Sequence, residues 1–211
     1  MASTLCPYCK KNSHMTPKWG RLLAGAAMAH MACTCDECHR IVIGEAFGQK
    51  LGVNAPTENF SYLSDALERA EEITWLPLAA EAPEVHDVPD SIARAAKEAY
   101  SSASVGNFMA AILMARTVIE ASAKDRGITS GNLKSKIDAM KDADLIRPAM
   151  AEQAHEVRFA GNDMAHGDID VAPDAIDAEE ILALMGSVLL EVFQDPARLE
   201  RIRAKRVAQS S

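Results

Sequence analysis

Residues 157–167 read V-R-F-A-G-N-D-M-A-H-G, and this stretch predicts an amphipathic helix. Arg158, Asn162 and His166 recur at every fourth residue, so one side of the helix carries all three. The opposite side is apolar and small, and consists of Met150, Ala154, Val157, Gly161 and Met164. A second helix can approach closely at the glycine. The polar row is therefore either a functional site or a polar seam between helices.

The whole chain after Pro89 predicts helices. Proline, serine and aspartate mark helix starts, and glycine marks their ends. The predicted helices cover residues 92–103, about 107–125, 133–140 and 148–166, then a stretch from Asp177 to a break at Asp195-Pro196, and a final basic helix. Asp177 is the expected N-cap of its helix, with Glu180 three residues later. The pattern predicts a four-helix bundle over 89–195 and a basic tail over 196–211.

Arg116 departs from the pattern of its own helix. At 100° per residue, its side chain points near the centre of the apolar stripe. A guanidinium in that position needs a partner, and Glu120, one turn later, is the nearest candidate. Either the two form a pair that sets the helix register, or they support the polar row of Arg158. His155, three residues before Arg158, extends that row.

The first 52 residues predict a small zinc ribbon. Cys6-Pro-Tyr-Cys9 and Cys35-Asp-Glu-Cys38 are two C-x-x-C turns separated by 25 residues. Each such turn presents two thiolates, and four thiolates form a common tetrahedral site for structural zinc. The arms of the ribbon are expected at residues 27–32 and 40–47. A four-thiolate site leaves no open position on the metal, so we expect a structural ion.

Other assignments of the cysteines are reduced thiols in a small core or redox C-x-x-C chemistry. Cys33, His39 and His14 are spare candidates without an assigned role. We expect Cys33 to point to the other side of its strand from Cys35. Residues 53–88 then predict a connector with a short helix at 61–72, and Trp75 is expected to anchor this connector onto the helical body.

Composition and charge restrict the function. The 211 residues are 48% hydrophobic and carry a net charge of −8, which is typical of a globular protein. We see no export signal and no membrane-spanning run, so we expect a cytoplasmic protein with reduced, metal-binding cysteines. The acidity disfavours non-specific nucleic-acid binding by the main body. Basic charge is concentrated in residues 1–52, with six basic against three acidic side chains, and in the tail.

The helical part resembles a known family. The residues that carry the resemblance are A-I-L-M-A-R-T-V-I-E at 111–120, Leu133 and R-F-A-G-N-D-M-A-H at 158–166. They are similar to the family catalogued as domain of unknown function 4145, whose members often carry an N-terminal ribbon and accompany restriction and phage-defence systems. The resemblance implies a mainly α fold, a HEPN-like four-helix bundle preceded by the small β zinc ribbon.

Active HEPN proteins are metal-independent ribonucleases with an Arg-x(4–6)-His motif, often paired across a dimer. Here seven residues separate Arg158 from His166, so the spacing is longer than in that motif. The resemblance therefore supports the fold more strongly than the activity.

Two functions fit these observations. In the first, the protein is nucleic-acid-associated, RNA-directed and part of a phage-defence, restriction or toxin system. Arg158 would hold a phosphate, Asn162 would orient it and His166 would act as acid and base in a metal-independent endoribonuclease. The alternative is a non-catalytic interaction or dimerisation module with structural zinc.

The expected partners are RNA or DNA, a protein of the defence system and a second copy of the chain, but no membrane. The long apolar face of Ile181–Val192 motivates the homodimer.

Overall fold

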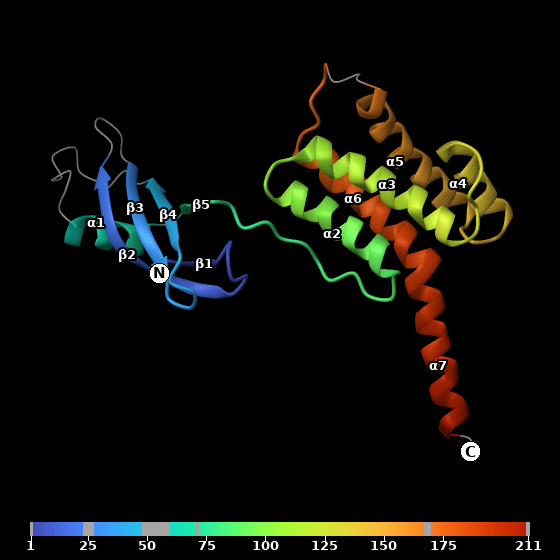
Figure 1. The fold of residues 1–211 in the computed structure, drawn as a ribbon, viewed down its shortest axis with the longest axis horizontal. Coiled ribbons are helices and arrows are strands. Elements are labelled where there is room, and N and C mark those ends of the chain that lie inside the picture. The colour runs from blue at the N-terminus through green and yellow to red at the C-terminus, as the bar shows by residue number, and fades with distance from the viewer. Residues whose placement is uncertain (1, 23–27, 48–59, 71, 167–169, 210–211) are drawn as a thin grey trace. The chain divides into compact units, whose positions relative to one another are not determined.

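The computed structural model describes residues 2–22, 28–47, 60–70, 72–166 and 170–209. The chain divides into two compact units, Met1–Ala80 and Glu81–Ser211 (Figure 1). The first contains a β-sheet with one helix, and the second is built from helices.

The first unit is a five-stranded antiparallel sheet in which each strand pairs with the next one along the chain. Its elements are β1 (Ser3–Leu5), β2 (Asn12–Leu22), β3 (Met28–Cys35), β4 (Ile41–Phe47), α1 (Phe60–Arg69) and β5 (Ile73–Leu76). Every second residue of β3 is buried, so one face of the sheet forms a core. Helix α1 covers this core through Leu63 and Leu67, which are fully buried.

The predicted fold class, a mainly α protein with a small ribbon before the bundle, is wrong. The chain is mixed α/β, because the sheet has five strands and its own core. Strands β3 and β4 correspond to the predicted ribbon arms, whereas β1, β2 and β5 were not predicted. Pro17 and Gly20 interrupt the strand pattern of β2, and its pairing register shifts between Pro17 and Trp19. Such an irregularity hides the two-residue period in the sequence.

Trp75 belongs to this sheet. It lies in β5 opposite Gly44 of β4, and a Cβ at residue 44 would come 3.0 Å from Cζ3 of the indole ring. The tryptophan packs against the core of the first unit. The prediction that Trp75 anchors the connector onto the helical body is therefore wrong.

The second unit is a helical bundle around a central helix, α3. Its elements are α2 (Asp90–Ser104), α3 (Phe108–Asp125), α4 (Leu133–Asp142), α5 (Pro148–His166), α6 (Ala175–Leu189), the π-helical segment η1 (Leu190–Gln194) and α7 (Asp195–Gln209). Helix α3 packs against α2, α4, α5 and α6. The apolar side of α6 and η1, including Met185, Val188 and Val192, is buried in this core. The face that motivated the expected homodimer is thus used inside one unit.

Helix α6 begins earlier than predicted. Asp174 is its N-cap, since Oδ1 accepts hydrogen bonds from the N–H groups of Ile176 and Asp177 at 2.8 and 3.0 Å. The carboxylate of Asp177 accepts in return from the N–H of Asp174. Asp177 therefore occupies the N3 position of a capping box and is not its N-cap.

The predicted helix break at Asp195-Pro196 is absent. Segment η1 continues from α6 directly into α7. In an α-helix a proline lacks the N–H that would bond to the carbonyl four residues earlier, here that of Val192. Nη2 of Arg126 donates to this carbonyl at 2.8 Å, and the guanidinium lies 4.4 Å from the centroid of Phe193. Arg126 thus supplies a side-chain donor to this carbonyl, next to a π-helical segment that is continuous with α7.

Helix α7 has no buried residue and extends away from the other helices of its unit (Figure 1). Among the described helices, none combines the length and apolarity that crossing a membrane requires.

Candidate metal centre and the polar face of α5

A tight turn between β1 and β2 positions the first two cysteines. The N–H of Cys6 donates to the carbonyl of Lys11 at 2.9 Å, and the N–H of Lys10 donates back to the carbonyl of Cys6 at 3.0 Å. Lys10 adopts a left-handed conformation with φ of 58°. This conformation closes the turn directly after Cys9.

The turn between β3 and β4 repeats this arrangement. The N–H of Cys35 donates to the carbonyl of Arg40 at 3.0 Å, and the N–H of His39 donates to the carbonyl of Cys35 at 2.8 Å. His39 has a φ of 60° and an exposed side chain, so it shapes the backbone directly after Cys38. The two C-x-x-C segments therefore fold as equivalent turns.

The four cysteines of these turns form one cluster. Their Sγ atoms all lie within 4.8 Å of one another, with 3.7 Å between Cys6 and Cys38 and 3.9 Å between Cys9 and Cys35. Four sulfurs bound tetrahedrally at zinc–sulfur distances of about 2.3 Å would lie about 3.8 Å apart. The predicted ligand set is thus brought together, and its geometry and soft donors fit a zinc ion.

The surroundings of the cluster favour negative charge on one thiol. Burial raises the pKa of Cys35, but hydrogen bonds from the Ser13 hydroxyl and from the N–H groups of Cys38 and Glu37 outweigh this and lower the pKa to about 6. The N–H of Arg40 lowers the pKa of Cys38, yet burial and the neighbouring thiols raise it to about 11. A bound cation would displace the remaining protons, because thiolates are the ligands.

Cys33 lies outside the cluster. It is buried on the same face of β3 as Cys35, because alternate residues of a strand share a face. The expectation that it points to the other side is wrong. Its thiol donates to the carbonyl of Met31 at 3.6 Å, and burial raises its pKa to about 11. Cys33 is therefore a core residue.

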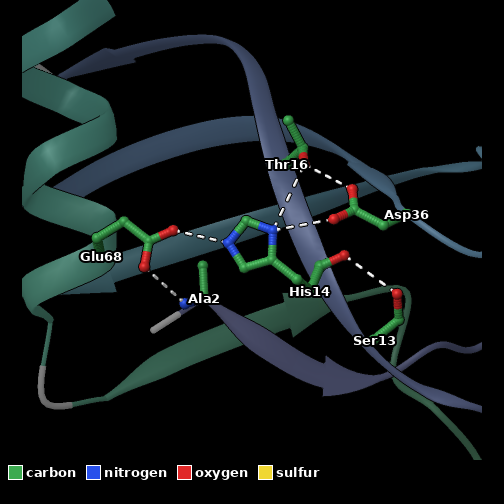
Figure 2. Close-up of polar contacts among 6 residues, drawn as sticks. All are labelled: Ala2, Ser13, His14, Thr16, Asp36 and Glu68. Carbon is green, nitrogen blue, oxygen red and sulfur yellow. Dashed lines mark hydrogen bonds and ion pairs between the residues drawn. The ribbon is translucent and has the colours of Figure 1, made fainter.

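His14 of β2 contacts Glu68 of α1 and Asp36 of the turn that follows β3 (Figure 2). Its Nε2 lies 2.9 Å from Oε1 of Glu68 in α1, and its Nδ1 lies 3.3 Å from Oδ2 of Asp36. The hydroxyl of Thr16 donates to the other Asp36 oxygen, and the N–H of Ala2 donates to Oε2 of Glu68. Glu68, and then Asp36, raise the pKa of His14. The sequence indicated His14 only as a spare candidate. It did not indicate Asp36 and Glu68 as its partners, because they are far from His14 along the chain.

In the helical unit, the polar row of α5 begins with a chain of contacts. Nε of Arg158 donates to Nδ1 of His155 at 3.4 Å, and Nε2 of His155 lies 3.2 Å from Oδ1 of Asp138 in α4. If Nδ1 accepts, Nε2 carries the proton that Asp138 accepts. The hydrogen bond from His155 lowers the pKa of Asp138. Sequence reasoning found His155 but not Asp138.

The guanidinium of Arg158 also lies 3.8 Å from the ring centroid of Phe159, whose side chain is 53% exposed. Asn162 is half-buried on the next turn. The side chain of His166 lies outside the described residues, so its position beside Arg158 stays a prediction. Eight residues along one helix correspond to about 12 Å of rise between Arg158 and His166.

The apolar side of α5 packs as predicted, with Ala154, Val157 and Gly161 buried. Arg116 of α3 reaches α5 at Gly161, and its Nε is buried with no hydrogen-bond partner. The predicted pair of Arg116 with Glu120 is not formed. The alternative, that Arg116 and Glu120 support the polar row of α5, stays a prediction.

Glu120 pairs with two lysines. Its Oε1 accepts from Lys124 at 2.8 Å and from the buried Lys136 of α4 at 2.9 Å. Lys124, and then Lys136, lower the pKa of Glu120 to about 2. This cluster ties α3 to α4.

Comparison with known families gives a match over the helical unit. Residues 97–205, which are 109 of the 211 residues, match the family described as Domain of unknown function (DUF4145). The chain belongs to this family. The DUF4145 match begins within α2, ends within α7 and contains all of α3 and α5. No curated protein and no solved structure gives a significant match.

Proposed function

We propose that the protein binds single-stranded nucleic acid, RNA in the first place, on the polar face of α5. The observation that carries this proposal is the guanidinium of Arg158 lying 3.8 Å from the ring centroid of the exposed Phe159. Exposed aromatic rings and arginine planes stack on unpaired bases, and arginine also pairs with phosphate. Asn162, on the next turn, offers both a donor and an acceptor to a base edge.

The net charge of the chain restricts the kind of nucleic acid that it can bind. With a net charge of −8 and no long basic stripe on α5, the protein is unsuited to following the backbone of a duplex. A short single-stranded segment needs only local stacking and a few phosphate contacts. The proposed ligand is therefore a loop or an end of an RNA.

The proposal also includes cleavage of the bound RNA. His166 is the candidate acid and base for a metal-independent endoribonuclease of a phage-defence, restriction or toxin system, and Arg158 is the candidate phosphate ligand. The HEPN-like relationship inferred from the sequence supports this chemistry. Arg158 and His166 are far apart within one chain. We therefore propose binding as the primary activity, and cleavage only where the residues of two chains combine.

Zinc is the proposed ion of the four-cysteine cluster, held by Cys6, Cys9, Cys35 and Cys38. It would cross-link the two turns and supply no open position for a substrate. Free cysteines are typical of a reducing compartment, which supports a cytoplasmic location.

The test is binding of a short fluorescently labelled single-stranded RNA, measured by anisotropy. Phe159→Ala and Arg158→Ala should each weaken binding by about tenfold, because one base–aromatic stack contributes about 1–3 kcal/mol. Ile176→Ala is the matched control, since Ile176 is a similarly exposed apolar side chain outside α5. If the unmodified protein does not bind, the proposal is wrong. A His166→Ala variant that binds but no longer cleaves would separate the two activities.

A second candidate is a non-catalytic interaction module, favoured by the Asp138–His155–Arg158 chain that ties α4 to α5. In that case the polar row stabilises the bundle. Arg158→Ala and His155→Ala would then lower the melting temperature, and RNA binding would be absent from the unmodified protein as well.

A further inference from the structure

Helix α7 presents a face that is both apolar and basic. Leu199 and Ile202 are 46% and 59% exposed, and no residue of the helix is buried. Arg203 and Arg206 share the side of these two residues, because the four recur at intervals of three and four. Residues 195–209 hold five basic and two acidic side chains in a unit that is otherwise acidic. This face suits a receptor that is apolar and negatively charged.

The same unit has an apolar and acidic hollow at the start of α6. A hollow of about 440 Å³ lies between α3, α5 and α6 and the segment that leads into α6. Ile112, Val171 and Ile181 contribute apolar surface, and Asp170, Asp177 and Glu180 contribute carboxylates. Among the described residues that line it, none is basic. Val171 is 86% exposed, so apolar surface of the hollow is open to solvent.

The α7 helix of one chain cannot reach the hollow of the same chain. The hollow lies at the first turns of α6, and α7 begins after the end of the continuous helix formed by α6 and η1. The 20 residue steps from Ala175 to Asp195 separate the two by about 30 Å along the helix. In Figure 1, α7 leaves the bundle at the end opposite the segment that leads into α6.

We propose that α7 of one copy lies in the acidic hollow of a second copy. Leu199 and Ile202 contact its apolar wall, and Arg203 beside them faces Asp170, Asp177 and Glu180. This contact uses different surfaces on the two chains, so it closes into a dimer when the exchange is reciprocal. An anionic lipid surface also accepts apolar side chains together with arginines. The hollow on the same unit, with both apolar and acidic lining, favours a second copy as the occupant. The inference goes beyond the proposed RNA binding and does not depend on it.

Sedimentation of the full-length chain over a wide concentration range tests the proposal. We expect concentration-dependent dimers that weaken at high salt, because the contact is partly electrostatic. Arg203→Glu and Glu180→Lys should each weaken the association by about tenfold or more, because like charges then meet. The double variant should recover most of the association, since the charges are exchanged between the two surfaces. Its recovery also shows that both substitutions leave the protein folded.

Two matched controls carry the same charge changes elsewhere on the helical unit. Arg94→Glu on α2 and Glu152→Lys on α5 both replace exposed side chains, and neither should change the association. A monomer at every concentration would overturn the proposal, as would single variants that associate as well as the unmodified chain. Binding to vesicles that contain phosphatidylserine is the last measurement. A monomeric protein that binds them through Arg203 would make α7 a lipid-binding helix and the proposal wrong.

Discussion

Gly161 of α5 packs directly against the side-chain stem of Arg116 in α3. A Cβ at residue 161 would lie 2.8 Å from both Cβ and Cδ of Arg116, closer than non-bonded carbons approach. The absence of a side chain at Gly161 therefore permits the close contact of the two helices. The same contact holds the stem of Arg116 between helices while its Nε is buried without a hydrogen-bond partner.

Gly161→Ala should destabilise the helical unit by about 1–2 kcal/mol, because the cost of overpacking exceeds the gain in helix propensity. In an Arg116→Gly background both clashing atoms, Cβ and Cδ, are absent, so the same substitution should stabilise the unit by up to about 1 kcal/mol. Urea unfolding of the four proteins measures both effects. An equal effect of Gly161→Ala in the two backgrounds would show that the contact with Arg116 is not the cause.

Acid should remove a specific part of the stability through Glu120. Its pKa falls from 4.5 to about 2 on folding, because Lys124 and Lys136 stabilise the carboxylate. The stabilisation is therefore fully present above pH 4.5 and is lost as the pH falls toward 2. After allowance for solvent screening it amounts to about 1–2 kcal/mol.

Glu120→Gln should remove this contribution at neutral pH and flatten the pH dependence of unfolding between pH 5 and pH 2. Asp142→Asn is the control, because Asp142 is an exposed carboxylate at the end of α4. If the two variants show the same pH dependence, the lysines around Glu120 do not contribute to the stability in the way predicted.

Metal analysis of the purified protein should find one zinc per chain. Cys38→Ala should lose the metal and lower the unfolding temperature of the sheet unit, since metal binding and folding are coupled. Cys33→Ala should keep the metal, because the Cys33 thiol lies outside the cluster. Elemental analysis combined with thermal unfolding, with and without a chelator, distinguishes these outcomes. Full metal content in Cys38→Ala would contradict the assignment.

Arg126→Met should destabilise the helical unit by about 1–3 kcal/mol, because the carbonyl of Val192 loses its donor in a half-buried position. Pro196→Ala in the Arg126→Met background should recover part of this loss, since alanine restores a backbone N–H at residue 196. Chemical unfolding of the single and double variants tests the prediction. A double variant that is less stable than Arg126→Met alone would refute it.

The sequence predicted the helices well because their signals are local. The three- and four-residue periods place α2, α3, α4 and α5 close to their observed bounds. The two C-x-x-C spacings likewise identified all four members of the metal cluster. The irregular register of β2 and the distant pairing of β5 with β4 left no comparable local pattern.

The side-chain partners of individual residues could not be predicted from such local patterns. The spacing favoured Arg116 as the partner of Glu120, but the buried Lys136 of another helix takes that place together with Lys124. The break expected at Pro196 is absent, and Arg126, 66 residues before Val192, donates to the Val192 carbonyl in this segment.

By itself, the sequence determined which segments are helical and which four cysteines can share a metal, because periodicity and ligand spacing are properties of short stretches. Only the tertiary structure decided the five-stranded sheet, the partners of Glu120 and His14, and the close contact at Gly161. Each of these depends on residues that are distant in the chain, and the packing of the folded protein selects among several partners that the sequence leaves equally possible.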